Sequence, residues 1–155
     1  MIEILPFEAR YASDFKDLNL EWLRRYFLVE PIDEEVLGRP DLIISGGGAI
    51  FLARAQARIV GTAALIKSGP RRYELSKMAV TPAWQGHGIS RKLPMAVIGA
   101  YEALDGEELY LESSSTLTPA LTLYESAGFV HASRPAGPIH YDRSDVYMVY
   151  RGVSA

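Results

Sequence analysis

The order of apolar and polar positions along the chain predicts an alternation of strands and helices. Short apolar runs bounded by turn residues predict strands over residues 2–5, 50–55, 59–67, 73–81, 108–112, 129–133 and 145–151. Apolar residues at helical spacing predict helices over about 14–27, 89–104 and 118–127, and a shorter one from 33–35 that Gly38 and Pro40 interrupt. Because a helix connects the fourth strand to the fifth, these two strands should run parallel. The pattern predicts an α/β fold of the α+β type, with one mixed, mostly antiparallel sheet flanked by four helices.

The helix ends are predicted from residues that favour caps. Ser13 is the expected N-cap of the first helix and Thr118 that of the last, which has Pro119 at its first position and Gly128 at its end. Pro94 falls inside the helix over 89–104. A proline there should kink the helix or leave a carbonyl without its donor.

Composition and charge narrow the class of protein. The chain has 155 residues, a formal net charge of -3 and a pI of about 5.6, so we expect one domain over residues 1–155 and no nucleic-acid partner. It contains no cysteine, which excludes disulfides, thiolate metal sites and a cysteine nucleophile. The N-terminus lacks the apolar core of a signal peptide, and no apolar run reaches the roughly eighteen residues of a membrane span. We therefore expect a cytoplasmic protein with no membrane partner.

A strand that leads into a glycine-bearing helix start predicts a phosphate site. The strand over 73–81 is followed by the loop over 85–90, with the sequence Gln-Gly-His-Gly-Ile-Ser, which opens a long amphipathic helix. The first turn of a helix leaves backbone N–H groups without intrahelical partners, and the helix dipole adds partial positive charge there. His87, Arg91 and Lys92 place cationic side chains around the same point.

Two linked motifs give the chain a resemblance to a known family. Gln85-x-x-Gly88-x-Ser90 follows the fourth strand, and Tyr124-x-x-x-Gly128-Phe129 follows the fifth. With this order of elements, the chain resembles the GNAT superfamily of acyl-CoA-dependent N-acyltransferases over essentially its whole length. The resemblance implies a GNAT fold, with a sheet that splays between its fourth and fifth strands, and acetyl-CoA as co-substrate.

The resemblance also implies which residues bind the coenzyme. The loop backbone is implied to hold the pyrophosphate through Gln85, Gly86, His87, Gly88, Ile89 and Ser90, with Arg91 beside them. The pantetheine is implied to lie in the V between the splayed strands, bonded to the backbone of Met78 and Val80 on either side of Ala79. Ser90 stands where the family prefers Gly or Ala. Leu117 stands where many relatives carry an asparagine, so a side-chain contact to the cofactor should be missing.

Acetylation by direct attack needs a neutral amine, and therefore a group that removes a proton. A lysine-type amine has a pKa near ~10.4 and is mostly protonated at neutral pH. By the resemblance, Glu74 aligns with the glutamate that acts as general base in the histone-acetylating branch of the family. Glu112 on the neighbouring strand is the alternative base, and a water relay is a further route. Either glutamate can instead be a solvated or ion-paired side chain, with Arg71, Arg72 or Lys77 near Glu74.

Tyr124 is the candidate proton donor. It lies one helical turn after Ala120, so its phenol can point into the cleft toward the thioester sulfur. A phenol is protonated at neutral pH and can donate to a departing thiolate, whose free pKa is about 8.5. The alternative is a core tyrosine that packs under Gly128 and Phe129. The backbone N–H near Val80 is the candidate that polarises the thioester carbonyl.

The acceptor should bind on the other side of the V, against the first two helices and the loop before the last strand. The candidates are Trp22, Tyr26, Phe27, His140, Tyr141 and Arg143. We assign Trp22 mainly to the core and expect Tyr26 and Arg143 to face the ligand. His87 and His140 have no carboxylate or third histidine at ligand spacing, so we expect no metal.

The sequence thus predicts an enzyme, a GNAT-type N-acetyltransferase. It would move an acetyl group from acetyl-CoA to a primary amine of a small molecule, amino acid or peptide within a ternary complex. One alternative is a non-catalytic acyl-CoA-binding regulatory module. Another is a domain that holds ATP in its glycine loop, although it lacks the Lys-Ser/Thr of a P-loop and the acidic residue of a dinucleotide fingerprint. Dimers are common in the family, and a homodimer is an option that no stretch of this sequence specifies.

Overall fold

The computed structural model describes residues 1–135 and 144–152 and confirms the mixed sheet flanked by helices. The strands are β1 (Ile2–Pro6), β2 (Ala49–Ala55), β3 (Arg58–Gly69), β4 (Arg72–Val80), β5 (Glu108–Ser113), β6 (Phe129–His131) and β7 (Val146–Tyr150). The α-helices are α1 (Ala12–Tyr26), α2 (Pro31–Leu37), α3 (Pro40–Ser45), α4 (Ile89–Ala103) and α5 (Thr118–Ala127), and the 3-10 helices are η1 (Ala9–Tyr11) and η2 (Pro82–Trp84). In these ranges, no helix has the length and apolar character needed to cross a membrane.

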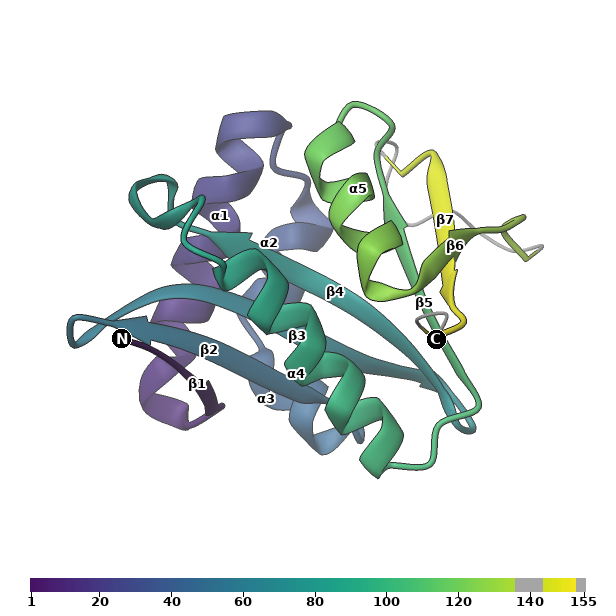
Figure 1. Cartoon of the computed structure of the whole chain (residues 1–155). Coiled ribbons are helices and arrows are strands. Elements are labelled where there is room, and N and C mark those ends of the chain that lie inside the picture. Colours follow the sequence, from purple (N-terminus) through teal and green to yellow (C-terminus); the bar gives the residue numbers. More distant parts are fainter. Residues whose placement is uncertain (136–143, 153–155) are drawn as a thin grey trace.

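The sheet follows the order β1-β2-β3-β4-β5-β7-β6, and β4 runs parallel to β5 (Figure 1). The other neighbouring strands are antiparallel. β4 and β5 pair only where each begins, from Arg72 opposite Glu108 to Glu74 opposite Tyr110. Beyond Glu74 no described strand pairs with this edge of β4. The sheet therefore opens into the predicted V between its fourth and fifth strands.

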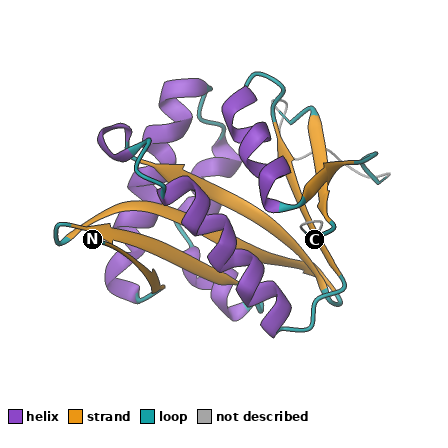
Figure 2. Cartoon of the chain, in the orientation of Figure 1, coloured by secondary structure: helices purple, strands orange, loops and turns teal. Residues whose placement is uncertain are grey.

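Helices cover both faces of the sheet (Figure 2). α4 and α5 lie on one face, and α1, α2 and α3 lie on the other (Figure 1). Successive residues of a strand point to opposite faces. β2 accordingly contributes Ala53 and Ala55 to the core under α4, and Ile50 and Leu52 to the core under α1. The two faces thus have separate apolar cores that share the same strands.

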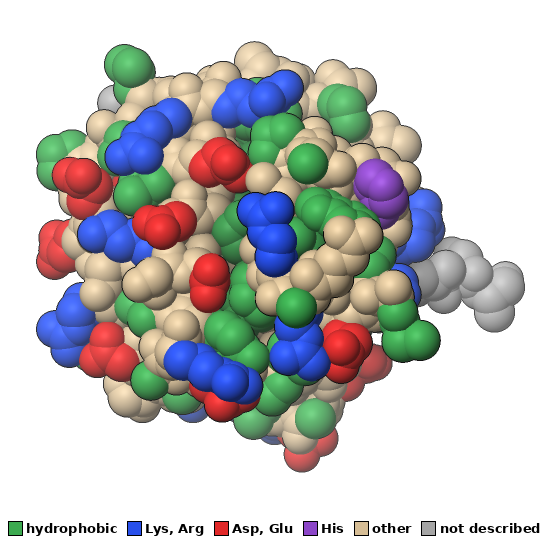
Figure 3. Space-filling view, turned by 90° about the vertical axis from the view of Figure 1, so that its left-hand side faces the viewer, with side chains coloured by type: hydrophobic (Ala, Val, Ile, Leu, Met, Phe, Trp, Pro, Cys, Tyr) green, Lys and Arg blue, Asp and Glu red, His purple; other side chains and the backbone are tan. Residues whose placement is uncertain are grey.

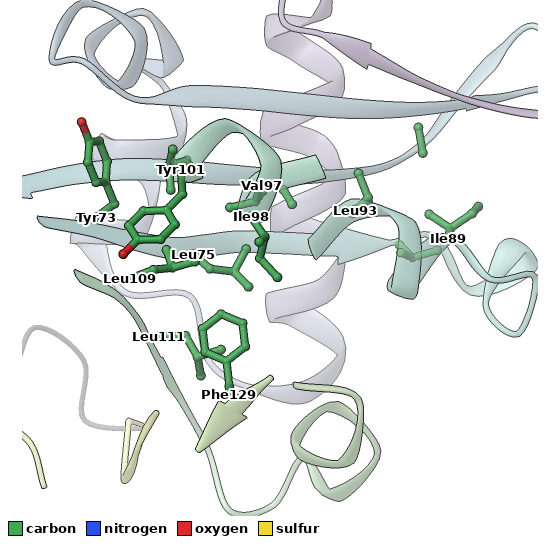
Figure 4. Packing of buried hydrophobic residues seen from close by; sticks show 14 of the residues in the cluster. Tyr73, Leu75, Ile89, Leu93, Val97, Ile98, Tyr101, Leu109, Leu111 and Phe129 are labelled. Carbon is green, nitrogen blue, oxygen red and sulfur yellow. The ribbon is translucent and has the colours of Figure 1, made fainter. Parts of the chain in front are cut away.

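The core under α4 fixes where the glycine loop ends. The apolar stripe of α4 consists of Ile89, Leu93, Val97 and Tyr101, all buried against the sheet. Figure 4 shows these side chains in the same cluster as Leu75, Leu109, Leu111 and Phe129 of the strands. Burial of each such side chain contributes roughly 1.5–3 kcal/mol. Ile89 is the first residue of α4, and its buried side chain anchors the first turn of the helix. Only the backbone N–H of Ile89 therefore stays available to a ligand.

The helix boundaries differ from those predicted, and five α-helices are present in the described ranges where four were expected. Ser13 does not cap α1, because η1 runs directly into that helix. Thr118 is already the first residue of α5. Pro31 begins α2, and Pro40, which was expected to interrupt a short helix, begins α3. A proline costs little at the first helical position, where its missing N–H would have no partner.

Pro94 lies within α4 and does not break it. The helix continues through Ala103, and the Pro94 side chain is buried against the sheet. Because proline has no N–H, the carbonyl of Ser90 lacks its usual donor four residues on. The free-energy cost of leaving this carbonyl without a hydrogen bond is offset by the burial of the apolar proline ring.

Candidate active site

A cavity occupies the V, with β4 and β5 along its sides. α1 and α2 close one end, and α5 closes the other. Its lining residues are Asn19, Trp22, Leu23, Phe27, Asp33, Leu37, Glu74, Leu75, Ser76, Lys77, Met78, Leu111, Glu112, Ser113, Ser114, Leu117, Ala120, Tyr124 and Ser144. The three catalytic candidates from the sequence, Glu74, Glu112 and Tyr124, are therefore brought together in one cavity.

A β-bulge in β4 shapes the side of this cavity. The pairing with β3 shifts after Ser76, so that Lys77 and Met78 together lie opposite Ala63. Lys77 has a φ of 53°, a left-handed conformation that a non-glycine residue rarely adopts. The bulge reorients the backbone over 78–80, the segment implied to bind the pantetheine. The residue types did not reveal the bulge, because it carries no glycine.

The backbone of Val80 faces the V. The N–H of Thr81 donates to the carbonyl of Val60 on β3 at 2.9 Å. Neighbouring residues of a strand direct their backbone groups to opposite edges, so the N–H and carbonyl of Val80 point away from β3. The Gln85 side chain donates from Nε2 to the Val80 carbonyl at 3.2 Å. Gln85 thus ties the end of β4 to the glycine loop, a contact that the sequence did not predict.

The loop before α4 forms a cradle of backbone donors. Gly86 and Gly88 have φ values of 83° and 84°, and a side chain at either position would meet no atom within 4 Å. Among the described residues, no backbone acceptor is recorded for the N–H of any residue in 86–90. The N–H of Gln85 instead donates to the Pro82 carbonyl at 3.3 Å. The cradle over 85–90 stays a prediction, and within it the N–H groups of 86–90 are the ones that suit an anion.

The cationic side chains around the cradle lie at the surface. The His87 ring packs against Trp84, with 4.9 Å between centroids, and its Nδ1 lies 3.2 Å from the Gln85 carbonyl oxygen. Arg91 and Lys92 are exposed on the first turn of α4. Figure 3 shows Lys and Arg side chains interspersed with Asp and Glu across the face it displays. Side chains of the two charge signs thus alternate on this face, without a patch of one sign.

Glu74 has a raised pKa in the cavity. Burial, reinforced by the negative charge of Glu112, raises its pKa from 4.5 to about 7, against the opposing effects of Lys77 and Arg72. A carboxyl with a pKa near the working pH is partly ionised and can take up and release a proton readily. The expected ion pairing with a neighbouring cation is absent from its recorded contacts in the described ranges.

Glu112 makes an ion pair that the sequence did not predict. Its Oε1 lies 2.6 Å from Nε of Arg134, and both side chains are largely buried. Arg71 and Arg72 pair instead with Glu107 and Glu108 on the far side of the strand start. The two candidate bases therefore differ: Glu112 has a guanidinium partner and Glu74 has a raised pKa.

Tyr124 lies between the core and the cavity. Its ring packs edge-on against Phe129, with 6.1 Å between centroids, so the expected packing near Gly128 and Phe129 is present. The same side chain also lines the cavity, and no hydrogen bond of its hydroxyl is recorded within the described ranges. Burial raises the pKa of Tyr124 to about 12. The phenol therefore stays protonated throughout the neutral range, as a proton donor requires.

The aromatic residues that line the cavity are not the ones that the sequence favoured for acceptor binding. Trp22, assigned mainly to the core, lines the cavity together with Phe27, with 5.5 Å between the two rings. Tyr26 is 42% exposed, lies under the Arg25 guanidinium and does not line the cavity. Tyr26 lies one helical turn after Trp22, so the two share a face of α1 and their ring centroids are 5.4 Å apart. Of the two, Trp22 lines the cavity and Tyr26 lies beyond its lining. His140, Tyr141 and Arg143 lie outside the described residues.

Comparison with known proteins gives the family. A model of the acetyltransferase (GNAT) domain matches residues 14–137. The chain belongs to the GNAT family of acetyltransferases. It is 31% identical over 102 residues to the N-alpha-acetyltransferase RimI of Mycobacterium tuberculosis, which covers 64% of this chain and 63% of that protein. The chain spans less than two thirds of the length of the curated relatives that it matches.

Solved structures support the GNAT fold. A GNAT acetyltransferase from Staphylococcus aureus Mu50 superposes with a TM-score of 0.87 at 22% identity, covering 97% of this chain and 98% of the other. A phosphinothricin acetyltransferase from Sinorhizobium meliloti, solved with AcCoA, superposes with a TM-score of 0.79 at 18% identity, covering 98% and 88%. At these identities the likeness shows the fold alone.

This GNAT domain has site residues that sequence reasoning missed. Asn19, Asp33 and Ser114 are buried polar residues that line the cavity, and Arg134 reaches its edge through Glu112. Asp33 could have been noticed, since an acidic residue in the first turn of α2 has a capping role, and it accepts a hydrogen bond from the Glu30 N–H at 2.9 Å. In the described ranges, no group of three His, Asp or Glu side chains could hold a metal ion.

Proposed function

We propose that this GNAT domain is an N-acetyltransferase that moves an acetyl group from acetyl-CoA to a primary amine by direct attack in a ternary complex. The observation that carries the proposal is that three features follow one another along β4 and into α4, starting at the cavity that Glu74 and Met78 line. These are a cradle of free amides at the start of α4, the open edge of β4 at Val80, and a cavity that holds both a raised-pKa carboxyl and a protonated phenol.

The residues present fit acetyl-CoA. The free N–H groups of 86–90 suit the pyrophosphate, with His87 and Arg91 beside them. The edge of β4 over Met78, Ala79 and Val80 suits the amides of the pantetheine, because its backbone groups have no described strand to pair with. When bound, acetyl-CoA supplies the acetyl group as a thioester. No metal is required by this chemistry.

Each catalytic need has a residue at the cavity. Glu74 accepts a proton from the incoming ammonium, directly or through water, which leaves a neutral amine able to attack the thioester carbonyl. The N–H of Val80 donates to the carbonyl oxygen as negative charge develops there. Tyr124 donates its hydroxyl proton to the departing sulfur as the amide bond forms and the C–S bond breaks. The second proton of the amine nitrogen is lost as the amide forms and restores the Tyr124 hydroxyl, directly or through water. Glu74 then returns its proton to solvent.

The lining favours a cationic amine that carries an apolar group. Trp22, Leu23, Phe27 and Leu37 form an apolar wall at the α1 and α2 end of the cavity. The ionisable side chains of the lining are the carboxyl groups of Asp33, Glu74 and Glu112 and the amine of Lys77. This balance suits an ammonium group better than a substrate carboxylate. Whether Arg143 adds a site for a carboxylate stays a prediction.

The test is acetyl transfer with a matched panel of acceptors. Purified protein is mixed with acetyl-CoA and with phenethylamine, phenylalanine or a short peptide with an apolar N-terminus. Free thiol and the mass of the acetylated product are then measured. We expect thiol release in equal amount to acetylated amine, with phenethylamine ahead of phenylalanine. Binding of CoA without release with any amine would favour the non-catalytic module. Thermal stabilisation by ATP and not by CoA would refute the coenzyme assignment.

A further inference from the structure

Arg134 is bound at two points beside the cavity. Its Nε lies 2.6 Å from Oε1 of Glu112, and its Nη2 donates to the Ser144 carbonyl at 3.0 Å. The exposed fractions of the Arg134 and Glu112 side chains are 23% and 16%. The pair is thus shielded from solvent, where removal of one charge leaves the other poorly compensated.

The Ser144 carbonyl that accepts from Arg134 precedes Asp145, and Asp145 joins β7 to the strand of Glu112. The Asp145 carboxylate accepts hydrogen bonds from the N–H and the hydroxyl of Ser115 at 2.7 and 2.6 Å. The N–H of Asp145 donates to the Ser113 carbonyl at 3.1 Å. Both contacts join the start of β7 to the end of β5, the strand of Glu112. The guanidinium therefore has a fixed frame on which to hold the carboxylate.

We propose that Arg134 is a positioning residue that holds Glu112 as a fixed, ionised carboxylate in the cavity side opposite Glu74. The Arg134 guanidinium supplies the counter-charge of Glu112 at a largely buried position. Glu112 is therefore an ion-paired carboxylate at the side of the cavity. Its role is to present a constant negative charge that favours the protonated form of Glu74 and attracts the ammonium of the acceptor. This inference rests on the proposed acetyl transfer.

The charged groups around Glu74 come from several elements. Arg72 and Lys77 belong to its own strand, and Glu112 comes from β5. Asp33 of α2 lines the same cavity. Tyr110 on β5, opposite Glu74, also senses its charge. The uncharged phenol of Tyr124 faces the same space. Changes at Arg134 and Glu112 leave all the other groups in place, so a shift in the titration of Glu74 can be assigned to this pair.

The test measures kcat/KM as a function of pH. The midpoint of its rise on the acid side gives the pKa of the catalytic base. Glu112→Gln should lower this midpoint by roughly 0.5 to 1 pH unit, because a like charge is removed, and should raise the acceptor KM, because the ammonium loses a counter-charge. Arg134→Gln should raise the midpoint, because Glu112 loses its compensation, and Arg134→Lys should restore it. In the Glu112→Gln background, Arg134→Gln should cause no further shift.

Two results would overturn the proposal. Loss of the plateau in Glu112→Gln by about 100-fold or more would make Glu112 the base. An equal shift from Arg134→Gln with and without Glu112 would mean that Arg134 acts directly on Glu74. The pKa of the Glu74 carboxyl measured by carbon NMR on the same variants needs no turnover. It should show the same shifts, so an inactive wild type would refute the proposed function while this inference is still tested.

Discussion

The candidate site has a coenzyme end and an acceptor end, and these are built from different parts of the chain. The coenzyme end is made of backbone: the free N–H groups of 86–90 and the edge of β4 at Val80. The acceptor end is made of side chains from α1 and α2, with Trp22, Phe27 and Asp33 among them. A backbone site depends on the element order and a few glycines, whereas a side-chain site depends on the rotation of each helix about its axis. The first can be inferred from a motif, and the second needs coordinates.

The largest effect should come from the proton donor between the two ends. Tyr124→Phe should lower kcat by roughly 100-fold, because the sulfur then leaves without a proton. The affinity for CoA should stay within about twofold, because the phenol hydroxyl touches only the reacting end. Steady-state kinetics and calorimetric titration with CoA measure the two values. Tyr101→Phe is the matched control, since its ring lies in the core under α4. An unchanged kcat in Tyr124→Phe would remove the acid assignment.

The backbone end is tested at its second glycine. Gly88 has a φ of 84°, so Gly88→Ala should strain the loop by about 1–2 kcal/mol and place a methyl group where the anion approaches. We expect the Kd for CoA to rise about tenfold. Gly99→Ala, at an open position of the same helix, should instead stabilise the fold by about 0.5–1 kcal/mol and leave the Kd unchanged. Equal Kd values for both variants would remove the cradle from the coenzyme site.

The side-chain end is tested with two aromatic residues of α1. Trp22→Ala should raise the acceptor KM about fivefold, on the order of 1 kcal/mol for a lost aromatic contact, while the KM for acetyl-CoA stays constant. Tyr26→Ala should leave both constants unchanged, because Tyr26 does not line the cavity. The reverse outcome would restore the order that the sequence predicted.

The smallest effect concerns stability at Glu74, where the two ends meet. Its pKa is about 7 in the folded chain against 4.5 as the reference value, so the folded state binds more protons between these values and wild-type stability falls as the pH rises through them. Glu74→Gln cannot ionise, so it should gain stability relative to wild type at pH 8 and not at pH 4. After allowance for partial exposure, we expect on the order of 1–2 kcal/mol. Urea unfolding at both pH values measures it, and an equal gain at both would contradict the raised pKa.

The sequence predicted the parts of the molecule that local patterns determine. The order of elements along the chain, the parallel β4 and β5 and the glycine loop were predicted from alternation, turn residues and the helix crossover, whereas the V was implied by the family resemblance. The bulge at Lys77 was not, since a lysine rarely adopts a positive φ. The pairing of Arg134 with Glu112 joins residues far apart in the chain, and nothing in the spacing of their types signals it.

The helix caps and the acceptor end were also mispredicted, because tertiary packing and not the local sequence pattern decides them. Ser13 and Thr118 are good cap residues in principle, yet η1 and the approach to α5 place them inside their helices. Whether Trp22 or Tyr26 lines the cavity was likewise decided by how α1 packs on the sheet, which the amphipathic pattern leaves open.

The measurement closest to the central claim is the pH dependence of kcat/KM for wild type and Glu74→Gln, with an acceptor amine whose own pKa lies well above 9. Acetyl transfer through Glu74 predicts that wild-type kcat/KM rises with a midpoint near 7, in line with the pKa of that carboxyl, and then reaches a plateau. Glu74→Gln should lose this midpoint and fall by roughly 100-fold on the plateau. A Glu74→Gln enzyme with the wild-type rate and the wild-type midpoint would contradict the account.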